Sequence, residues 1–174
     1  IFHLPVLQDS PVNSLLHDLS NTFQYSLIIH PSSSTSPSIT PLHKIKVSVP
    51  KNLGSKKTRE LVDKIYNIND EFNKAVENNE PLAQKHLAIM KEENNRYALD
   101  LLEYYLNNGE YNQEDLLVLG IIAWNNGKYE MFSNAINKID KSKLNNTSFH
   151  NYLMALSDLI NGKIDDTKLK LQNS

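Results

Sequence analysis

The side chains that most often carry out chemistry are scattered along this chain. Its six histidines lack the spacing of a zinc-binding helix such as HExxH, and no two of them share a helical turn. The neighbouring acids Asp165 and Asp166 point in different directions on a helix, so this pair does not form a site by itself. Glu114 and Asp115 stand near a predicted helix start, where carboxylates interact favourably with the helix dipole. These residue types therefore predict no catalytic residue and no metal site.

The motifs of nucleotide-binding and hydrolytic enzymes are also missing from the sequence. It has only 5 glycines, none in a GxGxxG or GxxxxGK arrangement, and no GxSxG nucleophile motif. The absence of cysteine excludes a thiolate nucleophile, a disulfide and a cysteine-based zinc site. We therefore expect a non-enzymatic protein that uses no cofactor and acts on no small-molecule substrate.

One basic segment stands out as a candidate contact surface. Between residues 44 and 59 there are six cationic side chains and no acid, and apolar residues are interleaved with them. The cations are Lys44, Lys46, Lys51, Lys56, Lys57 and Arg59. Such a segment can contact the phosphates of structured RNA or an acidic protein face, or it can be a solvated linker that leads into a helix. Lys56 and Lys57 are unfavourable at a helix N-terminus, which favours a role beyond local structure.

Charge is distributed unevenly along the chain. Its 174 residues fit one domain with an attached arm, and 40% of them are hydrophobic, which is close to the globular norm. Residues 1–59 carry six basic and two acidic side chains, whereas the remainder carries 12 basic and 18 acidic ones. The two parts therefore have different electrostatics, and we expect them to have different partners.

Composition also bears on the compartment. A chain without cysteine fits a reducing environment, and no apolar run approaches the roughly 18 residues that span a bilayer, so we expect no membrane insertion. The sequence begins at Ile1 rather than methionine, which fits removal of a targeting segment. We expect an intracellular protein, with the mitochondrial matrix as one compartment that fits.

The elements that position these residues fall into two parts. Residues 1–54 contain six of the 7 prolines and read as an extended arm, with a short helix after Ser10 and an apolar extended segment over 23–29. A Ser/Pro-rich loop over 30–42 precedes residues 44–49, whose strict alternation predicts a half-buried strand. Two strands joined by a long loop form only a marginal ribbon, so this arm needs a surface to lie on.

From residue 55 onward the spacing of apolar residues becomes helical. We predict helices over about 55–78, 82–93, 97–109, 112–126, 129–139, 148–161 and 164–171. Asn94-Asn95 separates the second helix from the third, and Ser148 caps the sixth. Gly109, Gly127 and Gly162 end helices.

Two turns in this part repeat at the length of a helix-turn-helix unit. Residues 126–128 and 161–163 both read Asn-Gly-Lys and stand 35 residues apart. In the same register Gly120 aligns with Ala155, and a small side chain at a helix crossing lets two helices pack closely. A third, degenerate unit lies one period earlier, with Glu92 in place of the turn glycine.

The residues of these turns carry a family resemblance. Leu119-Gly120, Gly127-Lys128-Tyr129 and Ile136 resemble the tetratricopeptide pattern, although Phe132 stands where that family has a small residue and the closing proline is missing. The resemblance covers residues 82–172. The period is equally similar to that of pentatricopeptide repeats, which read single-stranded RNA through a basic groove, whereas this half is acidic. The resemblance implies a stack of helical hairpins with a concave surface for a peptide or protein segment. The alternative is an antiparallel helical bundle whose turns use Asn-Gly-Lys.

The sequence as a whole predicts a mainly α protein, in which a short stack of antiparallel, tetratricopeptide-like hairpins over residues 55–174 follows the arm. Our functional hypothesis is a helical-repeat subunit that acts as a scaffold, with other proteins of a larger assembly as partners. The alternative is an RNA-associated subunit, such as an organellar ribosomal or RNA-processing protein, that contacts RNA through residues 44–59. The candidate protein-docking aromatics are Tyr97, Tyr105, Trp124 and Tyr129.

Overall fold

The described part of this computed structural model comprises residues 45–145 and 147–163, and it is mainly α-helical with no strand. Its helices are α2 (Lys56–Glu77), α3 (Pro81–Asn108), α4 (Gln113–Asn125), α5 (Tyr129–Lys138) and α6 (Thr147–Ile160), with a short 3-10 helix, η2 (Lys141–Lys143), before α6. The mainly α class is confirmed. The predictions for residues 1–44 and for a helix over 164–171 lie outside the described residues.

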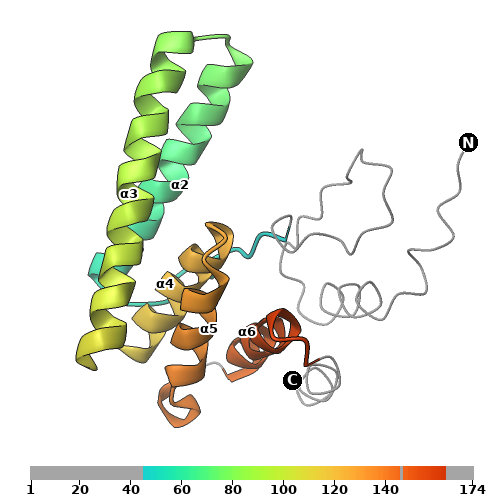
Figure 1. The fold of residues 1–174 in the computed structure, drawn as a ribbon. Helices are drawn as coiled ribbons and strands as arrows, with labels where there is room; N and C mark the ends of the chain where they lie inside the picture. The colour runs from blue at the N-terminus through green and yellow to red at the C-terminus, as the bar shows by residue number, and fades with distance from the viewer. Residues whose placement is uncertain (1–44, 146, 164–174) are drawn as a thin grey trace, which may run out of the picture.

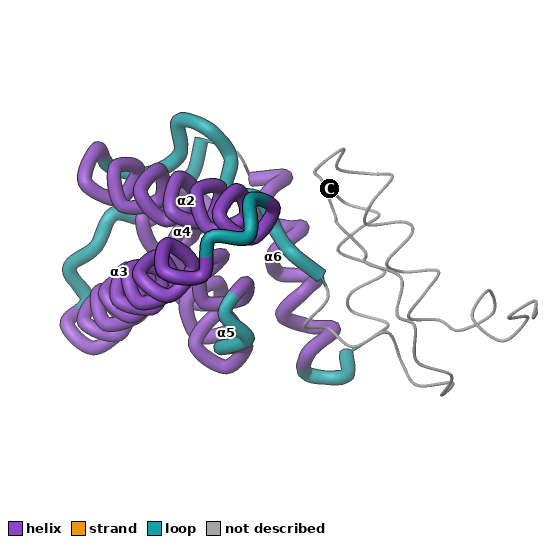
Figure 2. The backbone as a smooth tube through the Cα atoms, turned by 90° about the horizontal axis from the view of Figure 1, so that it is seen from above, coloured by secondary structure: helices purple, strands orange, loops and turns teal. Residues whose placement is uncertain are grey.

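Helices α2 and α3 form a long hairpin, and α4 and α5 form a shorter one (Figure 1). The α2–α3 hairpin extends well beyond the other helices, while α6 lies against α5. Seen from above, α4 lies at the centre of the described helices, in contact with α2, α3 and α5 (Figure 2).

Helix α3 is the main departure from the sequence prediction. The two helices predicted over 82–93 and 97–109 are one helix of 28 residues, so the break at Asn94-Asn95 was wrong. The side-chain amide of Asn94 donates to the carbonyl of Met90 at 2.6 Å, and that of Asn95 donates to the carbonyl of Lys91 at 2.9 Å. These bonds reach one turn back within the same helix, so neither asparagine caps a new one. The degenerate third repeat therefore does not form a hairpin.

The two Asn-Gly-Lys turns have the same geometry. Gly127 and Gly162 both have φ +72°, the left-handed conformation that ends a helix. In residues 126–128 and 161–163 alike, the lysine amide bonds to the carbonyl five residues back, at 2.9 and 2.8 Å. The asparagine side chain bonds to the carbonyl four residues back at 2.8 Å in both turns. The predicted repetition is thus present in the local structure of the turns.

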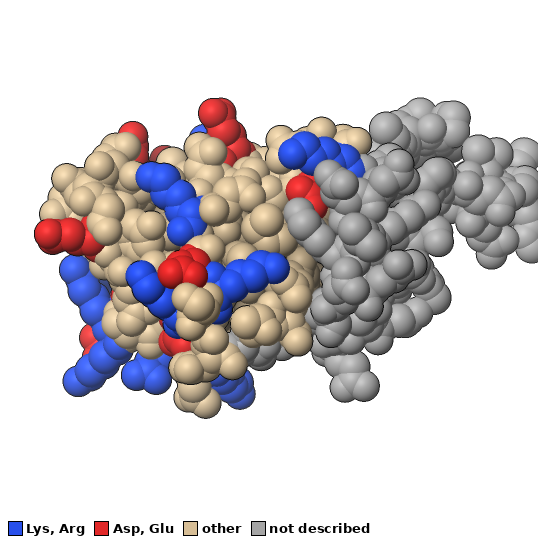
Figure 3. Space-filling model, turned by 90° about the horizontal axis from the view of Figure 1, so that it is seen from below, with Lys and Arg blue, Asp and Glu red and all other residues tan. Residues whose placement is uncertain are grey.

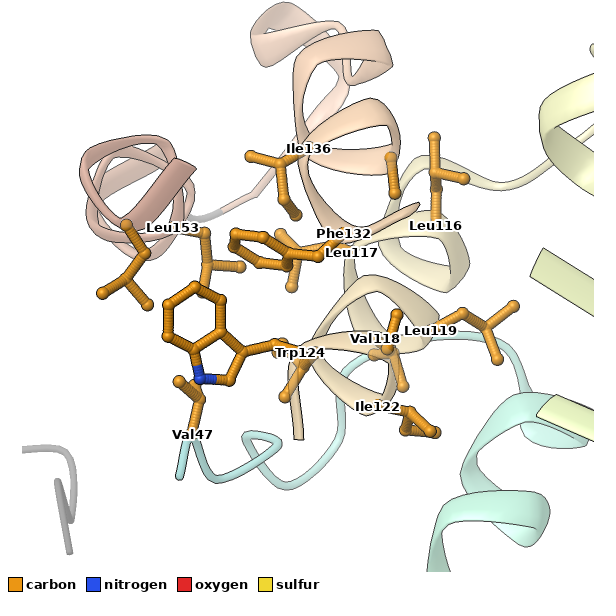
Figure 4. Packing of buried hydrophobic residues seen from close by; sticks show 14 of the residues in the cluster. Val47, Leu116, Leu117, Val118, Leu119, Ile122, Trp124, Phe132, Ile136 and Leu153 are labelled. Atoms are coloured by element: carbon orange, nitrogen blue, oxygen red, sulfur yellow. The ribbon is translucent and has the colours of Figure 1, made fainter. Parts of the chain in front are cut away.

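The core forms around α4. Ten of its 13 residues are buried, from Asp115 to Trp124, because its neighbours cover it on several sides. A Cβ placed on Gly120 would come within 3.2 Å of the Ile136 side chain and 3.4 Å of Ala135, so α4 and α5 cross closely at this glycine, as predicted. The indole of Trp124 stands edge-on to Phe132 with 5.0 Å between ring centroids (Figure 4).

The predicted bounds of the other helices differ from the structure by one or two residues. Ser55 caps α2, and its side chain accepts a hydrogen bond from the amide of Thr58. Asn112 caps α4 in the same way through the amide of Glu114. Helix α6 begins at Thr147, so Ser148 lies inside its first turn and is not its cap.

Candidate functional site

The segment 45–50 runs as an extended chain over the end of α4. Ile45 and Val47 are buried, at 1% and 3% exposure, whereas Lys46 and Ser48 are exposed. This is the alternation predicted for a half-buried strand. The strand itself was wrong for residues 45–49, because no neighbouring strand among the described residues pairs with them. This part of the arm therefore lies on the helical body itself.

Side chains of α4 take the place of a strand partner for this segment. Asn125 donates from Nδ2 to the carbonyl of Val47 at 2.7 Å, and its Oδ1 accepts from the amide of Val47 at 2.9 Å. Trp124 donates from Nε1 to the carbonyl of Ile45 at 2.8 Å. In Figure 4 the Val47 side chain lies next to the nitrogen edge of this indole. One carboxamide thus binds both main-chain groups of a single extended residue, as a neighbouring strand would.

Two carboxylates join the start of α4 to the start of α2. Asp115 accepts from the Ser55 amide at 2.6 Å and from the Ser55 hydroxyl at 2.8 Å, and Glu114 accepts from the amide of Gly54 at 3.1 Å. Both acids lie in the first turn of α4, where they were predicted to favour its dipole. They also bring negative charge to the N-terminus of α2, which offsets the unfavourable Lys56 and Lys57 there.

A cleft of about 420 Å³ opens between the segment 45–50 and helices α2, α3 and α4. Its walls carry five side-chain amides and two ammonium groups but no carboxylate. These residues are Asn69, Asn73, Asn95, Asn125, Asn126, Lys46 and Lys91, and we call this hollow the amide cleft. Burial lowers the pKa of Lys46, and the charge of Lys91 lowers it further.

The exposed side of α3 carries a second candidate surface. Leu82, Ile89, Tyr97 and Tyr104 are 84%, 51%, 49% and 56% exposed. His86, Glu93 and Asp100 stand between them and are also exposed. Steps of three and four residues place all of these on one face of the helix. We call this set of seven residues, Leu82, His86, Ile89, Glu93, Tyr97, Asp100 and Tyr104, the α3 stripe.

The predicted basic segment does not form one continuous patch. Lys44 lies outside the described residues, and the Lys46 ammonium donates to the carbonyl of Asn125 at 2.6 Å. The Lys56 ammonium lies 3.8 Å from the Glu60 carboxylate on the exposed side of α2. The remaining cations, Lys51, Lys57 and Arg59, are exposed. On the face shown in Figure 3, basic and acidic side chains are interspersed.

The four predicted docking aromatics have different environments. Tyr97 belongs to the α3 stripe, whereas Tyr105 and Tyr129 are half-buried and pack against the core. Trp124 is 1% exposed, so it is a core residue that also holds the segment 45–50. The ring of Tyr129 stands edge-on to that of Trp124 with 4.9 Å between centroids. Of the four, only Tyr97 is exposed, with about half of its surface, 49%, open to a partner.

Sequence reasoning missed three apolar members of the α3 stripe, Leu82, Ile89 and Tyr104. The signal was present, because the three-and-four spacing continues without interruption from residue 82 to residue 104. The expected break at Asn94-Asn95 hid it by dividing the stripe between two helices.

Other classes of site find no support in the part of the chain described above. There, no group of three or more histidine, cysteine or acidic side chains is placed to hold a metal ion. Over the same residues, no helix combines the length and the apolar character that crossing a membrane requires.

Comparison with protein-family models, with curated proteins and with solved structures finds no match to this chain.

Proposed function

We propose that this chain is a non-enzymatic helical subunit that binds other proteins in a larger assembly, and that the α3 stripe is its main docking surface. The observation that carries the proposal is the contrast between α3 and α4. Only two of the 28 residues of α3 are buried, Ala98 and Leu102, whereas ten of the 13 residues of α4 are. A long helix whose outer face repeats large apolar residues is a typical docking face for another protein.

The partner that fits the α3 stripe is an amphipathic helix with basic residues. From residue 82 to residue 104 the stripe extends over about 33 Å, the length of six turns of a partner helix. Its apolar residues alternate with ionisable ones, two of which, Glu93 and Asp100, are acids. Lysine or arginine side chains opposite these acids would complement them and set the register of the partner helix.

A repeat architecture is part of this proposal. The recurrence of the turn geometry at residues 126–128 and 161–163 supports a hairpin stack in which α4–α5 is one unit and α6 begins the next. The close α4–α5 crossing at Gly120 supports it as well. In such a stack each hairpin contacts only its neighbours, and side chains on one surface remain available to a partner.

Co-purification from the native source tests the proposal. A tagged full-length chain is compared with the variant Ile89→Glu/Tyr104→Glu and with the control Asn67→Glu, which adds charge at an exposed position of α2. We expect the double variant to lose its co-purifying proteins at least tenfold while the control keeps them. Cross-linking mass spectrometry should place a helical, basic segment of the partner against α3. Equal recovery of the same proteins by all three forms would refute the proposal.

RNA association through residues 44–59 is the second candidate function. The observation that favours it is the exposure of Lys51, Lys57 and Arg59, which have no ion pair among the described residues. If these side chains contact phosphates, RNA affinity falls steeply as salt increases, and Lys51→Gln/Lys57→Gln makes that salt dependence shallower. A chain that binds no structured RNA at low salt would rule this candidate out.

A further inference from the structure

The amide cleft carries more polar groups than the fold uses. Of its five asparagines, Asn125 binds the segment 45–50, and Asn95 and Asn126 bond to helix carbonyls and to each other. Asn69 and Asn73 remain, one turn apart on α2. The Oδ1 atom of Asn69 is buried and has no hydrogen-bond partner. A buried acceptor without a partner is unfavourable, so a rotation of this carboxamide that turns Oδ1 toward the cleft and a ligand N–H group would be stabilised.

The charge of the cleft is the second feature that needs a partner. Although the chain beyond residue 59 carries a net negative charge, Lys46 and Lys91 face the same hollow and no carboxylate lines it. The Lys91 ammonium is held over the ring of Phe72, 5.6 Å from its centroid. The pKa of Lys46 is lowered first by burial and then by the like charge of Lys91. An anion between them would relieve this repulsion.

The segment 45–50 shows how this part of the protein binds an extended main chain. The Asn125 side chain hydrogen-bonds to both the amide and the carbonyl of Val47, and the Tyr66 hydroxyl accepts from the amide of Val49 at 3.0 Å. Tyr66, Asn69 and Asn73 follow one another on the same face of α2, at helical steps of three and four. Asn69 and Asn73 thus extend, along α2, the row of groups that already binds main chain.

We propose that the amide cleft binds an extended, acidic peptide segment of a partner protein. Lys46 and Lys91 bind its carboxylate, and Asn69 and Asn73 bind its main chain as Asn125 binds Val47. A volume of about 420 Å³ is within the range of clefts that hold small ligands or a few residues. A peptide fits better than a phosphate group or an RNA backbone phosphate, because only the peptide brings an N–H donor together with the negative charge.

This site is separate from the α3 stripe. Lys91 lies on the opposite side of α3 from the stripe, since it is two residues from both Ile89 and Glu93. The two surfaces can therefore be tested independently, and failure of one proposal leaves the other standing.

Fluorescence anisotropy on the full chain tests the proposal. The probe is a fluorescein-labelled, C-terminally amidated peptide, Ser-Val-Asp-Val-Glu-Ser, and its matched control replaces Asp with Asn and Glu with Gln. At low salt we expect micromolar binding of the acidic peptide and at least fivefold weaker binding of the amide control. Lys91→Gln and Asn69→Leu should each weaken binding at least fivefold, while Asn67→Leu on the exposed side of α2 and Ile89→Glu on the stripe leave it unchanged.

Two further measurements make the outcome decisive. In nitrogen–proton spectra, the side-chain amide signals of Asn69 and Asn73 should shift on titration with the acidic peptide, and those of exposed Asn67 should not. A 12-nucleotide uridine RNA and inorganic phosphate are titrated in parallel. No binding of the acidic peptide at 1 mM, equal binding of both peptides, an unaltered affinity in Lys91→Gln, or tighter binding of the RNA would each overturn the proposal.

Discussion

Replacing Asn125 with leucine should weaken the attachment of the segment 45–50 to the helical body. The carboxamide makes two hydrogen bonds with Val47, at 2.7 and 2.9 Å, and leucine of similar size makes neither. A hydrogen bond of this kind contributes about 0.5–1.5 kcal/mol, so we expect the free energy of unfolding to fall by about 2 kcal/mol. For a chain of this length that corresponds to a melting temperature lower by about 4–8 °C.

Urea unfolding followed by circular dichroism measures this change. Asn67→Leu is the matched control, because Asn67 is exposed on α2 and removal of its amide should change the free energy of unfolding by less than about 0.5 kcal/mol. Limited tryptic digestion gives an independent readout, since release of the segment should accelerate cleavage after Lys46. If Asn125→Leu and Asn67→Leu have the same free energy of unfolding, and cleavage after Lys46 is unchanged, the two hydrogen bonds from Asn125 do not hold this segment on the helical body.

Three further predictions concern the two glycine turns, the α4–α5 crossing and Tyr129. Gly127→Ala and Gly162→Ala should each lower the free energy of unfolding by about 1–2 kcal/mol, because both glycines have φ +72° and alanine disfavours that conformation. Urea unfolding should give similar losses for the two variants. Gly120→Leu should lower the free energy of unfolding by about 1–3 kcal/mol, because the new side chain meets Ile136 at the α4–α5 crossing, and a near-neutral result would contradict the close packing. Burial raises the pKa of Tyr129, so the folded state favours the neutral phenol: stability from this group is constant below about pH 10, the ordinary tyrosine value, and is lost as pH rises above it. Urea unfolding between pH 8 and 11 should show a smaller loss in Tyr129→Phe than in the parent chain.

Local patterns in the sequence predicted much of the helical body. Apolar spacing and cap residues placed α2, α4 and α5 to within one or two residues. Helices α2 and α4 begin at the capping side chains of Ser55 and Asn112, and α5 follows the left-handed turn at Gly127 that ends α4. The alternation at 44–49 likewise predicted which side chains are buried between Ile45 and Ser48. Such features depend on residues close in sequence, so they can be read without the tertiary structure.

The continuity of α3 could not be read in the same way. An Asn-Asn pair is typical of a helix break, yet both amides can instead bond to carbonyls one turn back, and nothing local decides between the two. The error also concealed the α3 stripe, the docking surface that we propose. A helix of this length with an unbroken three-and-four pattern would have predicted the exposed face directly.

The contacts that join residues 45–55 to α4 were beyond local reasoning for another reason. Asp115 and Ser55 are 60 residues apart, and Asn125 and Val47 are 78 apart. No periodicity connects such positions, and a single sequence does not show which distant side chains meet. The burial of Trp124 is a related case, because an aromatic at helical spacing serves equally well in a core and in a docking face until its neighbours are known.

Photo-cross-linking from the α3 stripe tests the central claim most directly. A benzoyl-phenylalanine is introduced at position 104, in place of exposed Tyr104, and at position 67 on α2 as the control, and both chains are irradiated in the native source. We predict that position 104 cross-links to one protein of an assembly, through a helical segment that carries lysine or arginine, and that position 67 does not. The absence of any protein cross-link from position 104, or the same cross-linked products from both positions, would contradict the proposal that this face binds a partner.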